Sequence, residues 1–93
     1  MNMHSPTVVI DTREPAEYQA NHVDGARNIS AGQFASGEFR DLLADVPKDA
    51  PIIVYCRTGQ RSNTSRQFLT QAGYSNVTNG INQARVEQLL EEA

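Results

Sequence analysis

The chain has 93 residues, a formal net charge of −3 at pH 7 and one cysteine. A chain of this length forms one small domain and buries about two thirds of its unfolded surface, which is enough for a core without disulfides. The lone cysteine excludes an intrachain bridge, and the acidic balance disfavours nucleic acid, which binds to basic faces. No apolar run approaches the roughly 20 residues of a membrane span.

These limits predict a single domain over residues 1–93, with a flexible terminus at residues 1–6. We expect a monomer with no nucleic-acid partner and no membrane partner. The N-terminal residues MNMHSPT are polar and lack the apolar segment of a signal peptide. Removal of a signal would leave the same sequence, so the compartment stays open between cytoplasm and periplasm. His4 lies in this terminus, and we assign it no role.

The apolar periodicity predicts short strands that alternate with helices. The first half of the chain has a strand over 8–10 ending at Asp11, a helix over 16–20 after Pro15, a turn at 24–25 and a strand over 27–30. Helical pieces follow between 34 and 46, the better one over 38–44, and a polar break covers 47–51. The second half has the strongest strand over 52–55, a helix over 62–72 stopped by Gly73, a strand over 76–78 and an amphipathic helix over 86–93. Alternating strands and helices imply an α/β fold of three layers, in which a central parallel sheet is flanked by helices.

A polar hexapeptide, CRTGQR, follows the strongest predicted strand. It lies where the carboxyl end of a strand meets the start of a helix, the edge at which open α/β sheets bind ligands. Unpaired N–H groups and about half a positive charge attract anions there, and a glycine-containing loop turns further amides toward one centre. The candidate site residues are Cys56, Arg57, Thr58, Gly59, Gln60 and Arg61.

The anion that suits this loop is the thiolate of Cys56. A free thiol with a pKa near 8.5 is only about 3% ionised at pH 7. If the pKa is lower by two units, the thiol is about three-quarters ionised, which requires the thiolate to be stabilised by roughly 2.7 kcal/mol relative to the thiol. A helix terminus supplies about 0.3–1 kcal/mol of this stabilisation. We expect the loop amides and arginines to supply the rest and the thiolate to act as a nucleophile. The alternatives are a buried structural cysteine and, for Arg57, a solvated surface charge; Arg61, at the helix entrance, is the better anion partner.

Three segments, in order, resemble the single-domain rhodanese family of sulfurtransferases over nearly the whole chain. VVIDTREPAEYQANHVDGARNIS resembles its first signature, Asp-x-Arg, then Glu-Tyr, then Gly-His-Ile-x-Gly-Ala-x-Asn-Ile-Pro. IIVYCRTGQRS resembles the active-site loop, and AGYSNVTNGI resembles the Gly-Tyr-x-x-Val segment ahead of the last helix. The short N-terminus and the tail most resemble the small phage-shock type found in the bacterial periplasm.

The chain departs from the family pattern at several positions. Asn21 replaces a glycine, Ser30 replaces a common proline, and Asn79-Gly80 stands where a double glycine is frequent. Asparagine tolerates left-handed backbone, so the turn before His22 survives the first change. A tryptophan often found beyond the double glycine is absent, as are the strand and helix that usually precede Asp-x-Arg. We expect these changes to affect sheet size and pocket walls but not the loop.

The resemblance implies a double displacement at Cys56. The thiolate takes the outer sulfur of a donor such as thiosulfate, and the resulting persulfide passes it to cyanide, a thiol or a protein acceptor. The loop residues 57–61 bind the anionic donor and the persulfide, and no metal or organic cofactor takes part. By the same resemblance Asp11 and Arg13 support the loop through hydrogen bonds, and His22 supports a turn rather than acting as a general base.

Two other functions stay open. Cysteine phosphatases and arsenate reductases can share this fold but use Cys-x5-Arg, whereas Arg61 gives a tighter Cys-x4-Arg ring that suits a single sulfur atom. The other is a non-catalytic carrier that holds persulfide sulfur for a dedicated partner.

Overall fold

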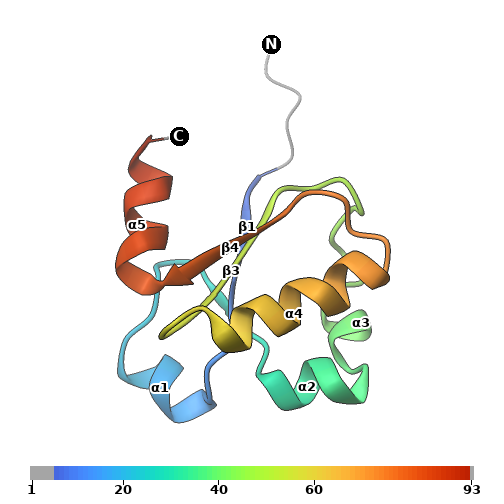
Figure 1. The fold of residues 1–93 in the computed structure, drawn as a ribbon, viewed down its shortest axis with the longest axis horizontal. Helices are drawn as coiled ribbons and strands as arrows, with labels where there is room; N and C mark the ends of the chain where they lie inside the picture. Colours follow the sequence, from blue (N-terminus) through green and yellow to red (C-terminus); the bar gives the residue numbers. More distant parts are fainter. Residues whose placement is uncertain (1–5, 93) are drawn as a thin grey trace.

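A computed structural model describes residues 6–92, and within them the chain forms four strands and five helices (Figure 1). In order these are β1 (Val8–Asp11), α1 (Pro15–Ala20), β2 (Arg27–Asn28), α2 (Ala31–Ser36), α3 (Phe39–Leu42), β3 (Ile52–Cys56), α4 (Gln60–Gln71), β4 (Val77–Asn82) and α5 (Gln83–Glu92). The strands pair in parallel in the order β2-β1-β3-β4. The predicted α/β fold with a parallel sheet between helices is confirmed.

Neighbouring side chains along β1 and β3 enter two separate cores, because successive residues of a strand point to opposite faces. Ile10, Ile52 and Val54 pack with buried residues of α2, α3 and α4, namely Phe34, Phe39 and Leu69. Val9, Ile53 and Tyr55 pack on the other face with Tyr18 of α1 and with Val86 and Leu90 of α5. Figure 1 shows the two helix groups on either side of the strands. Tyr55 and Cys56 therefore project to opposite faces of the sheet.

Several element boundaries differ from the prediction, each for a local reason. Ser30 does not extend β2, because its side chain accepts a hydrogen bond from the Gln33 amide and forms a capping box at the start of α2. The helix after the hexapeptide begins earlier than predicted, at Gln60, because Gly59 adopts a left-handed φ of 93° and caps α4. Gly73, at φ 101°, follows the end of α4 as predicted. Residues 1–5, with His4, and Ala93 lie outside the described residues, so the flexible terminus stays a prediction.

The strand β4 runs to Asn82, beyond the predicted end at 78, and contains a bulge. Val54 pairs with Asn79 and Tyr55 pairs with Ile81, so Gly80 is an extra residue in the ladder. A Cβ at Gly80 would lie 2.5 Å from a Val86 methyl and 2.8 Å from an Ile53 methyl. Glycine is therefore required where α5 crosses the sheet. The bulge also turns Asn79 and Ile81 toward the loop after β3.

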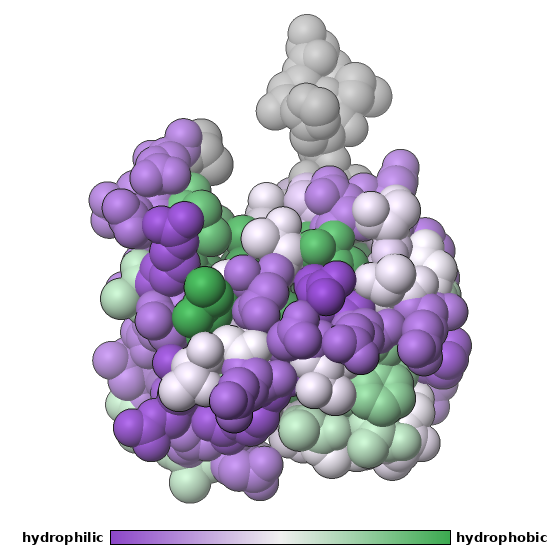
Figure 2. Space-filling model, viewed as in Figure 1, coloured by the Kyte–Doolittle hydropathy of each residue, from purple (hydrophilic) through white to green (hydrophobic). Residues whose placement is uncertain are grey.

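Most of the surface seen in Figure 2 is hydrophilic, with apolar surface beside α5. Two large apolar side chains of the described residues are exposed, Leu42 at 40% and Ile81 at 42%. Ile81 also has a φ of 76°, which is unusual for a β-branched residue.

Candidate active site

Cys56 ends β3 and is almost completely buried, at 2% exposure. Its Sγ accepts hydrogen bonds from the backbone amides of Gly59 at 3.1 Å and Ser62 at 3.5 Å, and the Ser62 Oγ lies 3.4 Å away. The left-handed Gly59 lets the chain fold back over the sulfur and enter α4. Amides that donate to sulfur favour the thiolate over the thiol.

The pKa of Cys56 reflects two opposing effects. Burial alone raises the pKa of the thiol, because a buried charge loses its hydration. The Ser62 hydroxyl and the amides of Ser62, Thr58 and Gly59 more than offset this effect and lower the pKa to about 7. About half of the sulfur is then ionised at pH 7. The arrangement can therefore hold Cys56 as a thiolate, the form in which a cysteine is nucleophilic.

The two arginines of the hexapeptide lie in different surroundings. Arg57 is exposed, as are Thr58 and Gln60. The Arg61 guanidinium instead binds the carboxylate of Glu17 in α1, with N–O distances of 3.0 and 3.5 Å. This pairing with Glu17 raises the pKa of Arg61, and attraction to the Cys56 sulfur contributes further. Arg61 is thus held beside the loop by a residue that the sequence reasoning did not assign to the site.

Ser62 and Asn79 are two further residues that the sequence analysis did not place in the site. The Ser62 hydroxyl donates to Asn79 Oδ1 at 2.7 Å, and Asn79 Nδ2 donates to the Gly59 carbonyl at 3.0 Å. Ser62 lies in the first turn of α4, where backbone N–H groups lack helical partners. The sequence could therefore have predicted its amide as a free donor near the sulfur. The position of Asn79 depends on the bulge in β4, which leaves no clear local pattern.

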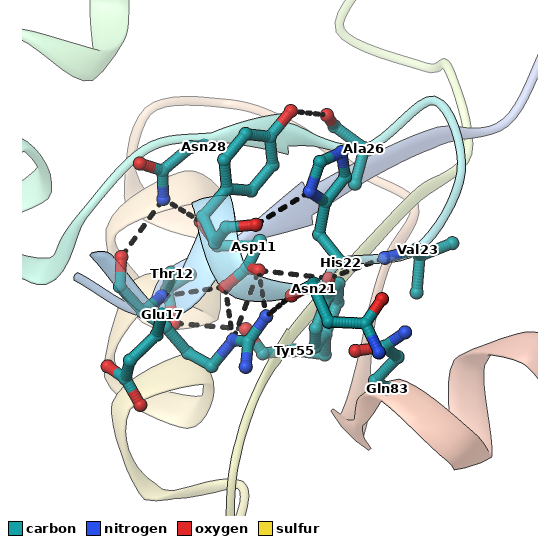
Figure 3. Close-up of polar contacts among 12 residues, drawn as sticks. Asp11, Thr12, Glu17, Asn21, His22, Val23, Ala26, Asn28, Tyr55 and Gln83 are labelled. Atoms are coloured by element: carbon teal, nitrogen blue, oxygen red, sulfur yellow. Dashed lines mark hydrogen bonds and ion pairs between the residues drawn. The ribbon is translucent and has the colours of Figure 1, made fainter. Parts of the chain in front are cut away.

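A largely buried hydrogen-bond network joins the ends of β1 and β3 (Figure 3). The Asp11 carboxylate accepts from the Tyr55 hydroxyl at 2.9 Å and from Arg13 Nη2 at 2.7 Å. Tyr55 also accepts the Val23 amide at 3.0 Å, and burial raises the pKa of Tyr55 to about 12. The structure thus brings Asp11 and Arg13 together around Tyr55, the residue before Cys56. Their support of the loop stays a prediction.

His22 lies between α1 and β2. Its Nδ1 is 2.7 Å from the Tyr18 carbonyl, which only accepts, so Nδ1 carries the proton. Its ring stacks on Tyr18 at 3.7 Å between centroids, and the Tyr18 hydroxyl donates to the Ala26 carbonyl. These contacts join His22 to Tyr18 of α1 and Tyr18 to the segment before β2. The structural role that the resemblance implies for His22 stays a prediction.

Within residues 6–92, no group of three His, Cys, Asp or Glu side chains gathers as metal ligands would, and no helix is long and apolar enough to cross a membrane.

A parallel α/β sheet in which backbone amides donate to a cysteine at a strand–helix junction defines a class of proteins that can stabilise a thiolate there. Comparison with known families identifies the class more narrowly, because the rhodanese-like domain matches residues 1–82. The chain belongs to this family. The suspected rhodanese membership is thereby confirmed.

Two relatives and one solved structure show how far the similarity extends. The chain is 36% identical over 70 residues to the thiosulfate sulfurtransferase PspE of Escherichia coli, covering 75% of this chain and 64% of PspE. It is 34% identical over 70 residues to the thiosulfate sulfurtransferase GlpE of Pseudomonas entomophila, covering 75% of this chain and 60% of GlpE. A structure of a rhodanese with anions from E. coli superposes with a TM-score of 0.73 at 31% identity, covering 86% of this chain and 91% of that chain.

The chain spans between 17% and 64% of the length of the first curated relatives that it matches. PspE and GlpE match at similar identity, so the narrower expectation of a small phage-shock type stays a prediction.

Proposed function

We propose that this protein is a thiosulfate sulfurtransferase that moves a sulfane sulfur to cyanide or a thiol through a persulfide on Cys56. The observation that carries the proposal is the ring of donors from Gly59 and Ser62 around the Cys56 sulfur, at 3.1 to 3.5 Å. Membership of the rhodanese-like family and the names of its relatives support the same reaction.

The first step is attack of the Cys56 thiolate on the outer sulfur of thiosulfate. A Cys–S bond to that sulfur forms, the sulfur–sulfur bond of thiosulfate breaks, and sulfite leaves with the bonding electron pair. In the second step the acceptor, a thiolate or cyanide, attacks the outer persulfide sulfur. Cys56 leaves as a thiolate, so charge and atoms balance without a metal, a cofactor or an added proton.

The site geometry suits each partner of this reaction. The amides that point at Sγ also suit the anionic persulfide, because backbone N–H groups bind anions without a counter-charge. Exposed Arg57 at the loop rim and half-exposed Arg61 add positive charge for a dianionic donor. A small inorganic donor, a thiol of the cell or a protein acceptor would approach the sulfur past the exposed residues Arg57, Thr58 and Gln60.

Intact-mass measurement after thiosulfate treatment tests the proposal directly. We expect a gain of about 32 Da, one sulfur atom, the covalent intermediate of a nucleophilic mechanism. Cyanide or a thiol should remove it, and Cys56→Ser should never acquire it. No mass gain at any thiosulfate concentration would contradict the proposal.

Turnover separates the proposed enzyme from the two alternatives. A carrier gains the sulfur but transfers it to small acceptors far more slowly than to a dedicated protein. A phosphatase hydrolyses an aryl phosphate in a reaction that Cys56→Ser abolishes. Arg61 follows Cys56 after four intervening residues rather than the five of Cys-x5-Arg, and this spacing disfavours the phosphatase.

A further inference from the structure

Asn79 of β4 contacts the loop through both ends of its amide group. Its Oδ1 accepts from the Ser62 hydroxyl at 2.7 Å and from the Ile81 amide at 3.0 Å, and its Nδ2 donates to the Gly59 carbonyl at 3.0 Å. The Gly59 carbonyl only accepts and the Ile81 amide only donates, so these two partners fix which end of the amide is oxygen. A glycine at this position, frequent in the family pattern, has no side chain to make these contacts.

The Ser62 hydroxyl has one proton and two acceptors within reach. Asn79 Oδ1 lies 2.7 Å from Ser62 Oγ, and the Cys56 sulfur lies 3.4 Å from it. When Cys56 is a thiol, its S–H donates to Ser62 Oγ and Ser62 donates to Asn79, so every proton has an acceptor. When Cys56 is a thiolate it only accepts. The Ser62 hydroxyl can then donate to the sulfur, beside the two backbone amides, only if its proton leaves Asn79.

We propose that Asn79 is a positioning residue that competes with the Cys56 sulfur for the single proton of the Ser62 hydroxyl, and so sets the balance between thiol and thiolate. The proposal deepens the proposed function, because that thiolate is the group that attacks the sulfur donor. Asn79 Oδ1 keeps the Ile81 amide when Ser62 turns away, so it is not left without a donor. The turn of the hydroxyl is a rotation about one bond, and the proton lost from Cys56 goes to solvent.

Other charges around Cys56 do not change when Asn79 is replaced by a neutral residue. Arg57 is exposed in the loop, Arg61 lies in the first turn of α4, and Glu17 of α1 binds Arg61. Asp11 at the end of β1, Arg13 two residues further on and Tyr55 of β3 are hydrogen-bonded to one another at the strand ends. Asn79 is uncharged, so its truncation to alanine changes no charge near the sulfur.

A double-mutant cycle on the alkylation of Cys56 tests the competition. The rate of reaction with iodoacetamide is measured against pH for the wild type, Ser62→Ala, Asn79→Ala and the double variant. Asn79→Ala removes the hydrogen bond from Asn79 Nδ2 to the Gly59 carbonyl whether or not the Ser62 hydroxyl is present, so the effect of that loss cancels in the cycle. We expect Asn79→Ala to lower the Cys56 pKa in the wild-type background more than in the Ser62→Ala background. The difference between the two pKa shifts should be at least about half a unit. At a pH well below the pKa this corresponds to about threefold faster alkylation.

A second variant keeps the test decisive if Asn79→Ala fails to fold. Asn79→Asp offers a stronger acceptor to the Ser62 hydroxyl, so the coupling should reverse sign and favour the thiol. The through-space effect of the new charge is common to both backgrounds and cancels. Thr78→Ala, at an exposed position of the same strand, is the matched control and should leave the pH profile unchanged.

Equal shifts with and without the Ser62 hydroxyl, for both Asn79 variants, would overturn the proposal and leave Asn79 only as a support for the loop. Alkylation needs no sulfur donor, so this result is independent of the proposed reaction. A chain that shows the expected coupling but gains no sulfur from thiosulfate would overturn the proposed function instead.

Discussion

The absence of a Cβ at Gly80 allows β4 to pack closely against α5 and β3 near the site. A methyl group there would overlap Val86 and Ile53, at 2.5 and 2.8 Å. We expect Gly80→Ala to lower the free energy of unfolding by about 1–3 kcal/mol, the range for an overpacked core. Urea denaturation measures this loss.

Gly32→Ala is the matched control for that substitution. Gly32 lies in α2, is exposed, and a Cβ there meets nothing closer than Ser30 Oγ at 3.9 Å. Because glycine is a poor helix former, this change should raise stability by up to about 1 kcal/mol. A Gly80→Ala protein as stable as the wild type would mean that the bulge relaxes without cost.

At the scale of elements, helices α1 and α4 meet across the loop through Glu17 and Arg61. Their side chains are 28% and 34% exposed, so solvent screens the pair and its contribution to stability is small. Its larger effect is on the sulfur, because Glu17 cancels part of the charge that Arg61 presents to Cys56. We expect Arg61→Ala to raise the Cys56 pKa and Glu17→Gln to lower it.

The pH profile of Cys56 alkylation measures both shifts, and we expect each to stay below about one unit because of the screening. pKa shifts of the same sign in Arg61→Ala and Glu17→Gln would contradict the interpretation that Glu17 partly cancels the charge of Arg61 at the sulfur. Arg66→Ala, further along α4 and bound to Asn63, is the control for loss of a positive charge.

Part of the fold and of the site could be predicted from the sequence. The alternation of β-branched runs with helical segments was enough for β1, β3, α4 and the parallel sheet, because burial on both faces leaves a strong local pattern. The loop around Cys56 followed from the strand–helix junction. Asn79 and Glu17 were missed because each reaches the site through contacts between elements distant in sequence, 17 residues for Ser62 with Asn79 and 44 for Arg61 with Glu17. Ser62 lies only six residues from Cys56, so its amide could have been predicted as a donor. The capping role of Ser30 was missed because residues 27–30 were predicted as one strand, which left Ser30 inside it.

For the whole molecule, two buried groups couple folding to pH in opposite directions. The Cys56 pKa is lowered from 9.0 to about 7, so the folded state favours its thiolate. This stabilisation is fully present above pH 9 and is lost as the pH falls through 7. The Tyr55 pKa is raised from 10.0 to about 12, so the folded state favours its neutral hydroxyl. That stabilisation is fully present below pH 10 and is lost as the pH rises through 12.

The free energy of unfolding should therefore rise between pH 7 and 9 and fall above pH 10, each change amounting to at most about 3 kcal/mol. Urea denaturation across this range, under reducing conditions, measures the profile. Cys56→Ala should remove the rise and leave the fall, whereas Tyr55→Phe should reduce the fall and leave the rise. Part of the fall should persist in Tyr55→Phe, because burial also raises the pKa of Tyr74. A rise of full size in Cys56→Ala would show that the sulfur is not ionised in the folded protein, and the thiolate on which both proposals depend would then be absent.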